Sequence, residues 1–298
     1  MRNIYTVKAK NKAASAIPAT VALFAIRPYY SVDFDNGNSG CQFEVLVNDV
    51  PVAKKIGTKG AITSSSPINS CILKSGKQQL KIKLYPNIGK TKITTSQENN
   101  SPFSLTITFR KDAWDQHNIS EVTVFKLPPI KLSKSCVSYF EKEFDFQAQV
   151  PYHFEGWSNS KNLAEVAGIG KMVVEKYEEI KQLLIARNYI AFLKLKKRKD
   201  TEMNASFYLK SNEVEDGDRF DREAFTEKDA QVQPFNNVKV VYYGNGKLVA
   251  LENTADKGSA LKSKIKHIAD NGKVKDEVIR FPVLLHMPAN SNKLEIIR

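Results

Sequence analysis

The sequence predicts a two-part chain, in which an all-β sandwich is followed by an α+β unit with helices first and an antiparallel meander after them. The 298 residues exceed the roughly 100 to 150 that a single domain usually holds. Apolar residues alternate with period two up to about residue 150, and from residue 162 they recur at spacings of three and four. We therefore expect a sandwich domain over residues 1–155 and a second domain over residues 156–298.

Strands are expected in the first part because short runs of β-branched and aromatic residues are bounded by turn-forming residues at intervals of about ten. In the clearest run, Leu80, Ile82 and Leu84 alternate with lysines, which indicates one buried and one solvated face. The predicted strands are residues 20–26, 42–47, 68–73, 78–85, 103–109, 121–127 and 143–150. We expect them to form two packed antiparallel sheets of immunoglobulin-like or jelly-roll-like type.

Helices are expected at the start of the second part. Residues 166–186 and 189–209 repeat at helical spacing with Asn188 between them, which predicts two consecutive helices or one kinked helix. The acidic residues 212–237 contain a short possible helix. Gly244-Asn245-Gly246 then predicts a hairpin, because its central positions tolerate positive φ. The strands expected from there on are residues 238–243, 248–251, 261–268, 278–285 and 294–297.

The paired helices at residues 177–186 and 188–197, followed by the meander, look like the cone fold of the nuclear transport factor and cystatin-like proteins. The resemblance covers residues 162–298 and is one of topology. It implies a fold that houses binding proteins, small-molecule enzymes and bacterial immunity proteins alike, so it does not select one function. Enzymes of that fold aim acid and base side chains into the cone, and none of these aligns onto this chain.

Charge is the unusual bulk property, with 45 Lys and Arg against 32 Asp and Glu and a formal net charge of +13. Such a balance suits nucleic acid, an anionic membrane surface or an acidic protein. The densest run is expected near the end of the second helix, where cations complement the helix dipole. Its members are Lys194, Lys196, Lys197, Arg198 and Lys199, and the first four of these are candidates for contact with a partner. Because neither interleaved aromatic residues nor a reader motif occurs, we do not expect nucleic-acid binding.

Catalytic and cofactor chemistry is not indicated by any motif. Gly168-Ile169-Gly170-Lys171 lacks the upstream strand and the following Ser or Thr of a phosphate loop. His117, His153, His267 and His286 stand far apart, without the spacing of metal ligands, and are expected at the surface or at strand edges. We therefore predict no catalytic, cofactor-binding or metal-binding residues.

The cysteines and the acidic segment have ordinary interpretations. Cys41, Cys71 and Cys136 are widely spaced and are expected to be buried thiols, although Cys41 and Cys71 could bridge two strands in an oxidising compartment. The acidic residues 213–223 lack the loop pattern of a calcium site. They are expected to form a solvated loop, or an acidic face that meets a basic partner or the lysine-rich helix of the same chain.

Aromatic residues near loops and strand ends are further candidates for partner contact, namely Tyr29, Tyr30, Trp114 and Trp157. Two interpretations stay open. Both tryptophans pack at the junction of the two parts, since large rings are usually mostly buried, or the rings are presented to a protein or a sugar.

The N-terminus resembles a signal sequence only superficially, because Pro18 interrupts the apolar residues 13–26 and no small-x-small site follows them. Residues 20–26 fit a first strand equally well. No uninterrupted apolar run reaches the roughly 18 residues that would suggest a membrane span. We expect a cytoplasmic protein, with a periplasmic or exported location as the alternative.

Three functions are compatible with these patterns. The leading one is a non-enzymatic binding protein of immunity or inhibitor type, in a bacterial secretion-system context, that recognises an acidic protein partner. The second is binding of a carbohydrate or an envelope polymer through loop aromatics. The third is a small-molecule enzyme with a pocket in the C-terminal unit, which would require a carboxylate or histidine of shifted pKa there.

Overall fold

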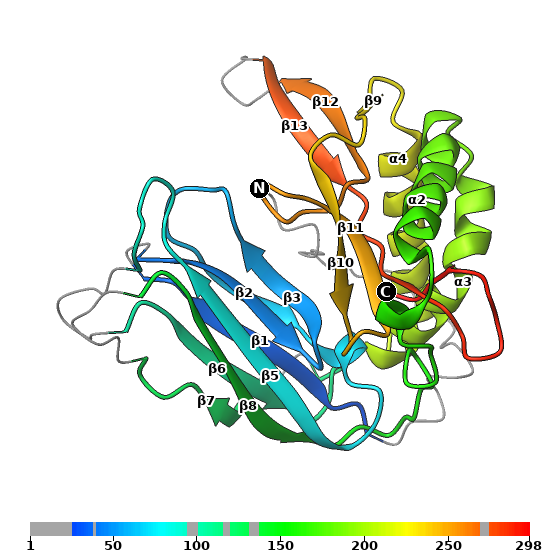
Figure 1. Ribbon diagram of the computed structural model, residues 1–298. Helices are drawn as coiled ribbons and strands as arrows, with labels where there is room; N and C mark the ends of the chain where they lie inside the picture. Colours follow the sequence, from blue (N-terminus) through cyan, green and yellow to red (C-terminus); the bar gives the residue numbers. More distant parts are fainter. Residues whose placement is uncertain (1–25, 38–39, 94–100, 116–119, 131–136, 269–273) are drawn as a thin grey trace.

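The computed structural model describes residues 26–37, 40–93, 101–115, 120–130, 137–268 and 274–298. Within these ranges the chain forms four antiparallel sheets, and three α-helices lie in its C-terminal half (Figure 1). The prediction of a β-rich α+β architecture is confirmed. The division into two separate domains stays a prediction, because one buried cluster contains side chains from both halves.

Two four-stranded sheets form the sandwich in the N-terminal half, one in the order β4-β1-β6-β7 and the other in the order β3-β2-β5-β8 (Figure 1). A short 3-10 helix, η1 (Asn69–Cys71), joins β4 to β5. The strands are β1 (Tyr29–Asp35), β2 (Gln42–Val47), β3 (Val50–Lys55), β4 (Thr63–Pro67), β5 (Gly76–Tyr85), β6 (Ser104–Arg110), β7 (Val122–Lys126) and β8 (Phe140–Ala148).

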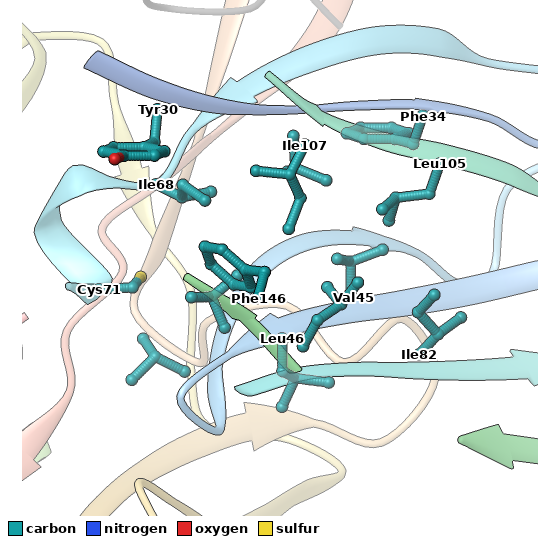
Figure 2. Packing of buried hydrophobic residues seen from close by; sticks show 14 of the residues in the cluster. Tyr30, Phe34, Val45, Leu46, Ile68, Cys71, Ile82, Leu105, Ile107 and Phe146 are labelled. Carbon is teal, nitrogen blue, oxygen red and sulfur yellow. The ribbon is translucent and has the colours of Figure 1, made fainter. Parts of the chain in front are cut away.

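The sandwich core follows from the period-two alternation of the facing strands. In β5, Leu80, Ile82 and Leu84 are fully buried, while the lysines between them point away from the core. Figure 2 shows Ile107 of one sheet above Val45 of the other, with their side chains directed into the space between the sheets. Each such side chain contributes about 1.5–3 kcal/mol on burial, so these layers hold without a disulfide.

Five predicted strands, residues 42–47, 78–85, 103–109, 121–127 and 143–150, correspond to β2, β5, β6, β7 and β8. The strand predicted at residues 68–73 is wrong, because this segment forms η1. There the buried Asn69 side chain accepts a hydrogen bond from the Tyr30 backbone N at 2.7 Å and donates to the Ser206 carbonyl at 3.0 Å. The strand predicted at residues 20–26 lies outside the described residues apart from Ile26. β1, β3 and β4 were not expected.

Three helices follow, α2 (Ile169–Ile185), α3 (Tyr189–Ser206) and α4 (Ser211–Thr226), and a 3-10 helix, η2 (Leu163–Glu165), precedes them. The predicted break at Asn188 is confirmed. Asn188 caps α3, since its Oδ1 accepts a hydrogen bond from the Ala191 backbone N at 3.1 Å. The acidic segment is a full helix and not a loop. Glu213 fixes its first turn by accepting from the Lys210 backbone N at 2.7 Å.

The strands after the helices divide between two antiparallel sheets, in the orders β10-β11-β14-β15 and β13-β12-β9, and do not form one meander. The predicted hairpin between β10 and β11 is confirmed, whereas the strand predicted at residues 278–285 is displaced, because β13 ends at Arg280. The strands are β9 (Gln231–Val232), β10 (Val238–Tyr243), β11 (Leu248–Asn253), β12 (Lys262–Ile268), β13 (Val274–Arg280), β14 (Leu285–His286) and β15 (Glu295–Ile296).

β11 joins the two halves because it is buried on both faces. Leu248 and Ala250 belong to the hydrophobic cluster of the sandwich core, whereas Val249 and Leu251 belong to a second cluster that contains the buried residues of α2 and α3. The sheet of β10 and β11 is therefore a middle layer, with the sandwich on one side and the helices on the other (Figure 1).

Glu44 of β2 is a buried carboxylate of the sandwich that is matched by a lysine from the C-terminal half. Lys257 Nζ donates to the Glu44 carboxylate and, at 2.8 Å, to the hydroxyl oxygen of Tyr85, which itself donates to Glu44 at 2.6 Å. Burial alone would raise the pKa of Glu44, but the bonds from Lys257 and Tyr85 outweigh burial and lower it. The carboxylate therefore stays charged inside the interface.

Glu252 of β11 is held by the reverse arrangement. Lys54 of β3 donates to Glu252 at 2.6 Å and to the Tyr243 hydroxyl oxygen at 2.7 Å, and that hydroxyl donates to Glu252 at 2.8 Å. Each half thus supplies one glutamate and one tyrosine and receives one lysine from the other half. We call these two sets the reciprocal triads. Since stripping one partner from a buried ion pair costs about 3–5 kcal/mol, the triads fix how the layers sit on one another.

Candidate functional site

An open hollow of about 590 Å³ lies between α2, α3 and the chain at β15. It combines four cations with an apolar floor, and we call it the β15 groove. Its lining residues are Lys176, Lys194, Leu195, Lys197, Arg198, Thr201, Glu202, Leu294, Glu295 and Ile296. A second hollow of about 340 Å³ lies between α3 and α4, and we call it the α4 groove. Its lining residues are Leu193, Lys194, Lys197, Asp200, Thr201, Asn204 and Asp218.

Lys194 and Lys197, two members of the predicted basic run, line both grooves. Both side chains are exposed, and neither forms an ion pair with any residue that the structure describes. The expected position at the end of a helix is wrong, because the run lies in the middle of α3 and the last turn of α3 carries no basic residue. These cations are therefore not used to balance the helix dipole.

Lys196 is buried and cannot reach a partner, which corrects its assignment as a partner-binding residue. Its Nζ lies 2.9 Å from Asp200 of α3 and 2.9 Å from Asp221 of α4, and 3.8 Å from Asp218. Burial would lower the pKa of Lys196, but the Asp200 and Asp221 carboxylates outweigh burial and raise it. The acidic segment thus meets the lysine-rich helix of its own chain, which was one of the interpretations left open by the sequence.

Two further cations of the β15 groove are already paired. Arg198 lies 3.2 Å from Glu155 and 3.5 Å from Glu202. Lys176 lies 2.9 Å from Glu179 one turn away on α2. These pairs are partly exposed, so they contribute little stability, but they do cancel charge at the groove. Lys194 and Lys197 are left as its unmatched cations within the described chain.

The interpretation that the rings are presented to a partner is wrong for Tyr30 and Trp157, which are 4% and 5% exposed. The Arg298 guanidinium lies 5.0 Å from the centre of the Trp157 ring, and the Tyr30 hydroxyl oxygen accepts from the Gln149 backbone N at 2.9 Å. Trp157 belongs to the same buried cluster as the sandwich core and β11. This confirms, for Trp157, the alternative of packing at the junction.

Trp114 and Tyr29 are half-buried and already have cations over their rings. Arg27 and Lys210 lie 4.0 and 5.0 Å from the centre of the Trp114 ring, and Arg110 lies 4.5 Å from the centre of the Tyr29 ring. Such contacts contribute about 0.5–2 kcal/mol each. A sugar that stacked on either ring would compete with these cations.

His286 is buried, which corrects its expected position at the surface. Its Nδ1 shares a hydrogen bond of 2.8 Å with Ser160 Oγ, and its Nε2 lies 3.9 Å from Glu295. Burial, followed by the positive charges of Arg198 and Arg298, lowers the pKa of His286 to about 4, so the ring is neutral at pH 7. Neither His286 nor Ser160 lines either groove, so this pair is not presented to a substrate there as a base and a nucleophile.

Cys41 and Cys71 are free buried thiols, and burial raises their pKa to about 12 and about 11. The bridge considered between them does not form. Cys136 and His117 lie outside the described residues, as does the side chain of His267. Among the residues that the structure describes, no cluster of His, Cys, Asp and Glu is placed to hold a metal ion.

Comparison of the chain with known protein families, with curated proteins and with solved structures finds no match. The resemblance to the nuclear transport factor and cystatin-like cone therefore stays a prediction. No helix in the described ranges is long and apolar enough to cross a membrane.

Two parts of the β15 groove could not be predicted from the sequence. Lys176 and the apolar residues Leu294 and Ile296 are separated along the chain by more than a hundred residues, and only the packing of α2, α3 and β15 brings them together. These apolar residues form the floor of the groove beside its lysines. The run of basic residues in the sequence does not predict such a floor.

Proposed function

We propose that this protein binds an acidic protein partner through the exposed lysines of α3 and that it does so without catalysing a reaction. The observation that carries the proposal is the position of Lys194 and Lys197, which are exposed between two grooves and form no ion pair with a carboxylate of the described residues. If this protein is of immunity or inhibitor type, the acidic surface of its target would complement them.

Electrostatics supports this kind of partner. Unmatched surface charges act mainly on the rate of encounter and are screened beyond about 8 Å at physiological ionic strength. Leu294 and Ile296 are 6% and 1% exposed and close the bottom of the groove, so the half-buried Leu195 supplies most of the apolar side chain that a partner could cover. The combination favours an acidic protein over a small anion, since a small anion would gain nothing from the apolar floor.

The carbohydrate alternative has less support. It relied on exposed rings, yet Trp157 is buried and the ring of Trp114 is covered by Arg27 and Lys210. The small-molecule alternative required a carboxylate or histidine of shifted pKa in a pocket. His286, whose pKa is lowered, lies outside both grooves. Burial raises the pKa of Asp200, which lines the α4 groove, but Asp200 is held in an ion pair with Lys196 at 2.9 Å.

The proposal is tested by pull-down from the source cells at low salt and again near 0.5 M salt, where exposed charges are screened to roughly 4 Å. Lys194→Glu/Lys197→Glu is compared with Lys90→Glu/Lys126→Glu, which makes the same change of charge at exposed lysines of the sandwich. We expect one acidic protein to be captured by the parent and by the control, to be lost by the first variant, and to be weakened by salt. Capture that both variants retain would refute the role of α3.

A further inference from the structure

The two grooves share Lys194, Lys197 and Thr201, so these three side chains form a ridge between two hollows. We call it the α3 ridge. Its members follow one another at spacings of three and four, which places them on one face of α3. The ridge is about 10 Å long, given a rise of 1.5 Å per residue, and corresponds to two helical turns.

A ridge with a groove on each side is the surface that a second helix packs against. Helices associate when the ridge of one enters the groove of the other, with the axes 8–10 Å apart in typical cases. On its inner sides, α3 contacts α2, α4 and β15. The α3 ridge is the face of this helix on which no further element of the described chain lies.

Asp200, Asp218 and Glu202 on the flanks of the ridge are paired inside the chain, whereas the lysines of the ridge are not. Asp200 and Asp218 of the α4 groove lie near Lys196, and Glu202 of the β15 groove accepts Arg298 at 2.9 Å. Glu295 of the β15 groove lies 3.9 Å from the neutral ring of His286 and has no cation as ion-pair partner among the described residues. The unmatched positive charge of the ridge therefore lies on Lys194 and on Lys197, which follows one turn further along α3.

We propose that the occupant of the α3 ridge is an acidic amphipathic α-helix of the partner protein. This inference rests on the proposed function and specifies the partner element. Carboxylates three or four residues apart on a helix lie about 5–6 Å from one another, which is also the spacing of Lys194 and Lys197 on α3. The partner helix bears apolar side chains on either side of its acidic stripe. These enter the β15 groove beside Leu195 and the α4 groove beside Leu193.

The test uses the full-length protein and a synthetic peptide of about 18 residues, long enough for helix formation when stapled. The peptide carries glutamates at spacings of three and four, leucines beside them, a hydrocarbon staple on the opposite face and a fluorophore for anisotropy. A second peptide of the same composition has proline in its centre and no staple, so it cannot form the helix. We expect the stapled helix to bind about tenfold more tightly or better, because it loses less freedom on binding.

Three variants separate charge from shape. Lys194→Glu/Lys197→Glu is expected to abolish binding of the stapled peptide, whereas Lys90→Glu/Lys126→Glu leaves it unchanged. Thr201→Trp keeps the charge but fills the space beside the ridge, and we expect it to weaken the stapled peptide about tenfold or more. Circular dichroism and the urea midpoint establish that each variant is folded.

Equal binding of the two peptides, or failure of the stapled helix to bind at all, would overturn the helical occupant. Either result is distinguishable from failure of the proposed function, because salt-sensitive capture of an acidic protein that depends on Lys194 and Lys197 can still be observed by pull-down. Undiminished binding to Thr201→Trp would likewise overturn the position of the helix on the ridge.

Discussion

The interface between the layers and the outer face of α3 use lysine in opposite ways. In the reciprocal triads, Lys54 and Lys257 are half-buried, and each is hydrogen-bonded to a glutamate and a tyrosine. On the α3 ridge, Lys194 and Lys197 are exposed and lack a carboxylate among the described residues. The first pair holds the molecule together and the second is free to attract a partner. A net charge of +13 does not distinguish them.

Lys196 shows how sharply the two uses are divided. It lies one residue before Lys197 and two after Lys194, yet it is 3% exposed and is surrounded by Asp200, Asp218 and Asp221. The phase of the helix decides which use applies. A lysine that faces α4 is matched by carboxylates, and a lysine that faces outward is not.

The largest effect is expected at the reciprocal triads. Lys54→Met leaves the Glu252 carboxylate, which is 5% exposed, without its cation, so the free energy of unfolding should fall by about 3–5 kcal/mol in urea denaturation. Lys126→Met, at an exposed lysine of β7, is the control and should change it by no more than about 0.5 kcal/mol.

The double variant Lys54→Met/Glu252→Leu sharpens this result. Removing both charges leaves no unpaired ion, so much of the loss caused by Lys54→Met should be recovered. If Lys54→Met lowers the free energy of unfolding no more than Lys126→Met does, the triads do not hold the layers together, and the structural role given to these lysines is wrong.

His286 tests whether burial keeps a ring unprotonated even though the Glu295 carboxylate lies 3.9 Å from its Nε2. The unfolded chain binds a proton at His286 below about pH 6.5, but the folded chain does so only below about pH 4. The unfolded state therefore holds more protons in this window, so stability falls as the pH falls from 6.5 to 4. The contribution of His286 to that loss is about 3 kcal/mol at most, and none is added below pH 4.

His286→Gln should make the fall in stability between pH 6.5 and pH 4 shallower, when urea denaturation is repeated across that range. His153→Gln, at an exposed histidine, should leave the slope as it is in the parent. Parallel slopes for the parent and His286→Gln would show that the interior accepts the protonated ring.

Local sequence patterns predicted the elements that depend on neighbouring residues. The Gly244-Asn245-Gly246 turn predicted β10 and β11, since Gly244 has φ +58° and a Cβ there would lie 2.9–3.0 Å from the Leu248 and Trp157 side chains. Asn188 predicted the start of α3. In contrast, β4 is a run of serines between Thr63 and Pro67 with no apolar period, and pairing with β1 alone makes it a strand.

The candidate site was predictable only in part. The burial of Lys196 could have been inferred, because it follows the buried Tyr189 and Phe192 at intervals of seven and four residues and so shares their face of α3. The reciprocal triads could not, since Lys54 and Glu252 are 198 residues apart and their meeting depends on the stacking of whole layers.

A smaller effect is expected on α3 itself. Lys196→Met leaves three carboxylates near one another, two of them partly exposed to water, and should cost about 1–2 kcal/mol of unfolding free energy. Lys194→Ser/Lys197→Ser should change it by no more than about 0.5 kcal/mol, because neither side chain has an ion pair to lose within the described chain. A large loss in the double serine variant would mean that the ridge is structural and is not reserved for a partner.

Brief acetylation of the folded protein, followed by mass spectrometry of each lysine, tests the division between bonded and free lysines most directly. Lys194 and Lys197 should be modified at least about tenfold faster than Lys196, because burial shields Lys196 and its neighbouring carboxylates raise its pKa and keep it protonated. Lys54 and Lys257 should also react slowly, because the Nζ of each is hydrogen-bonded to a glutamate and a tyrosine. Modification of Lys196 at the rate of Lys194 and Lys197 would contradict the account.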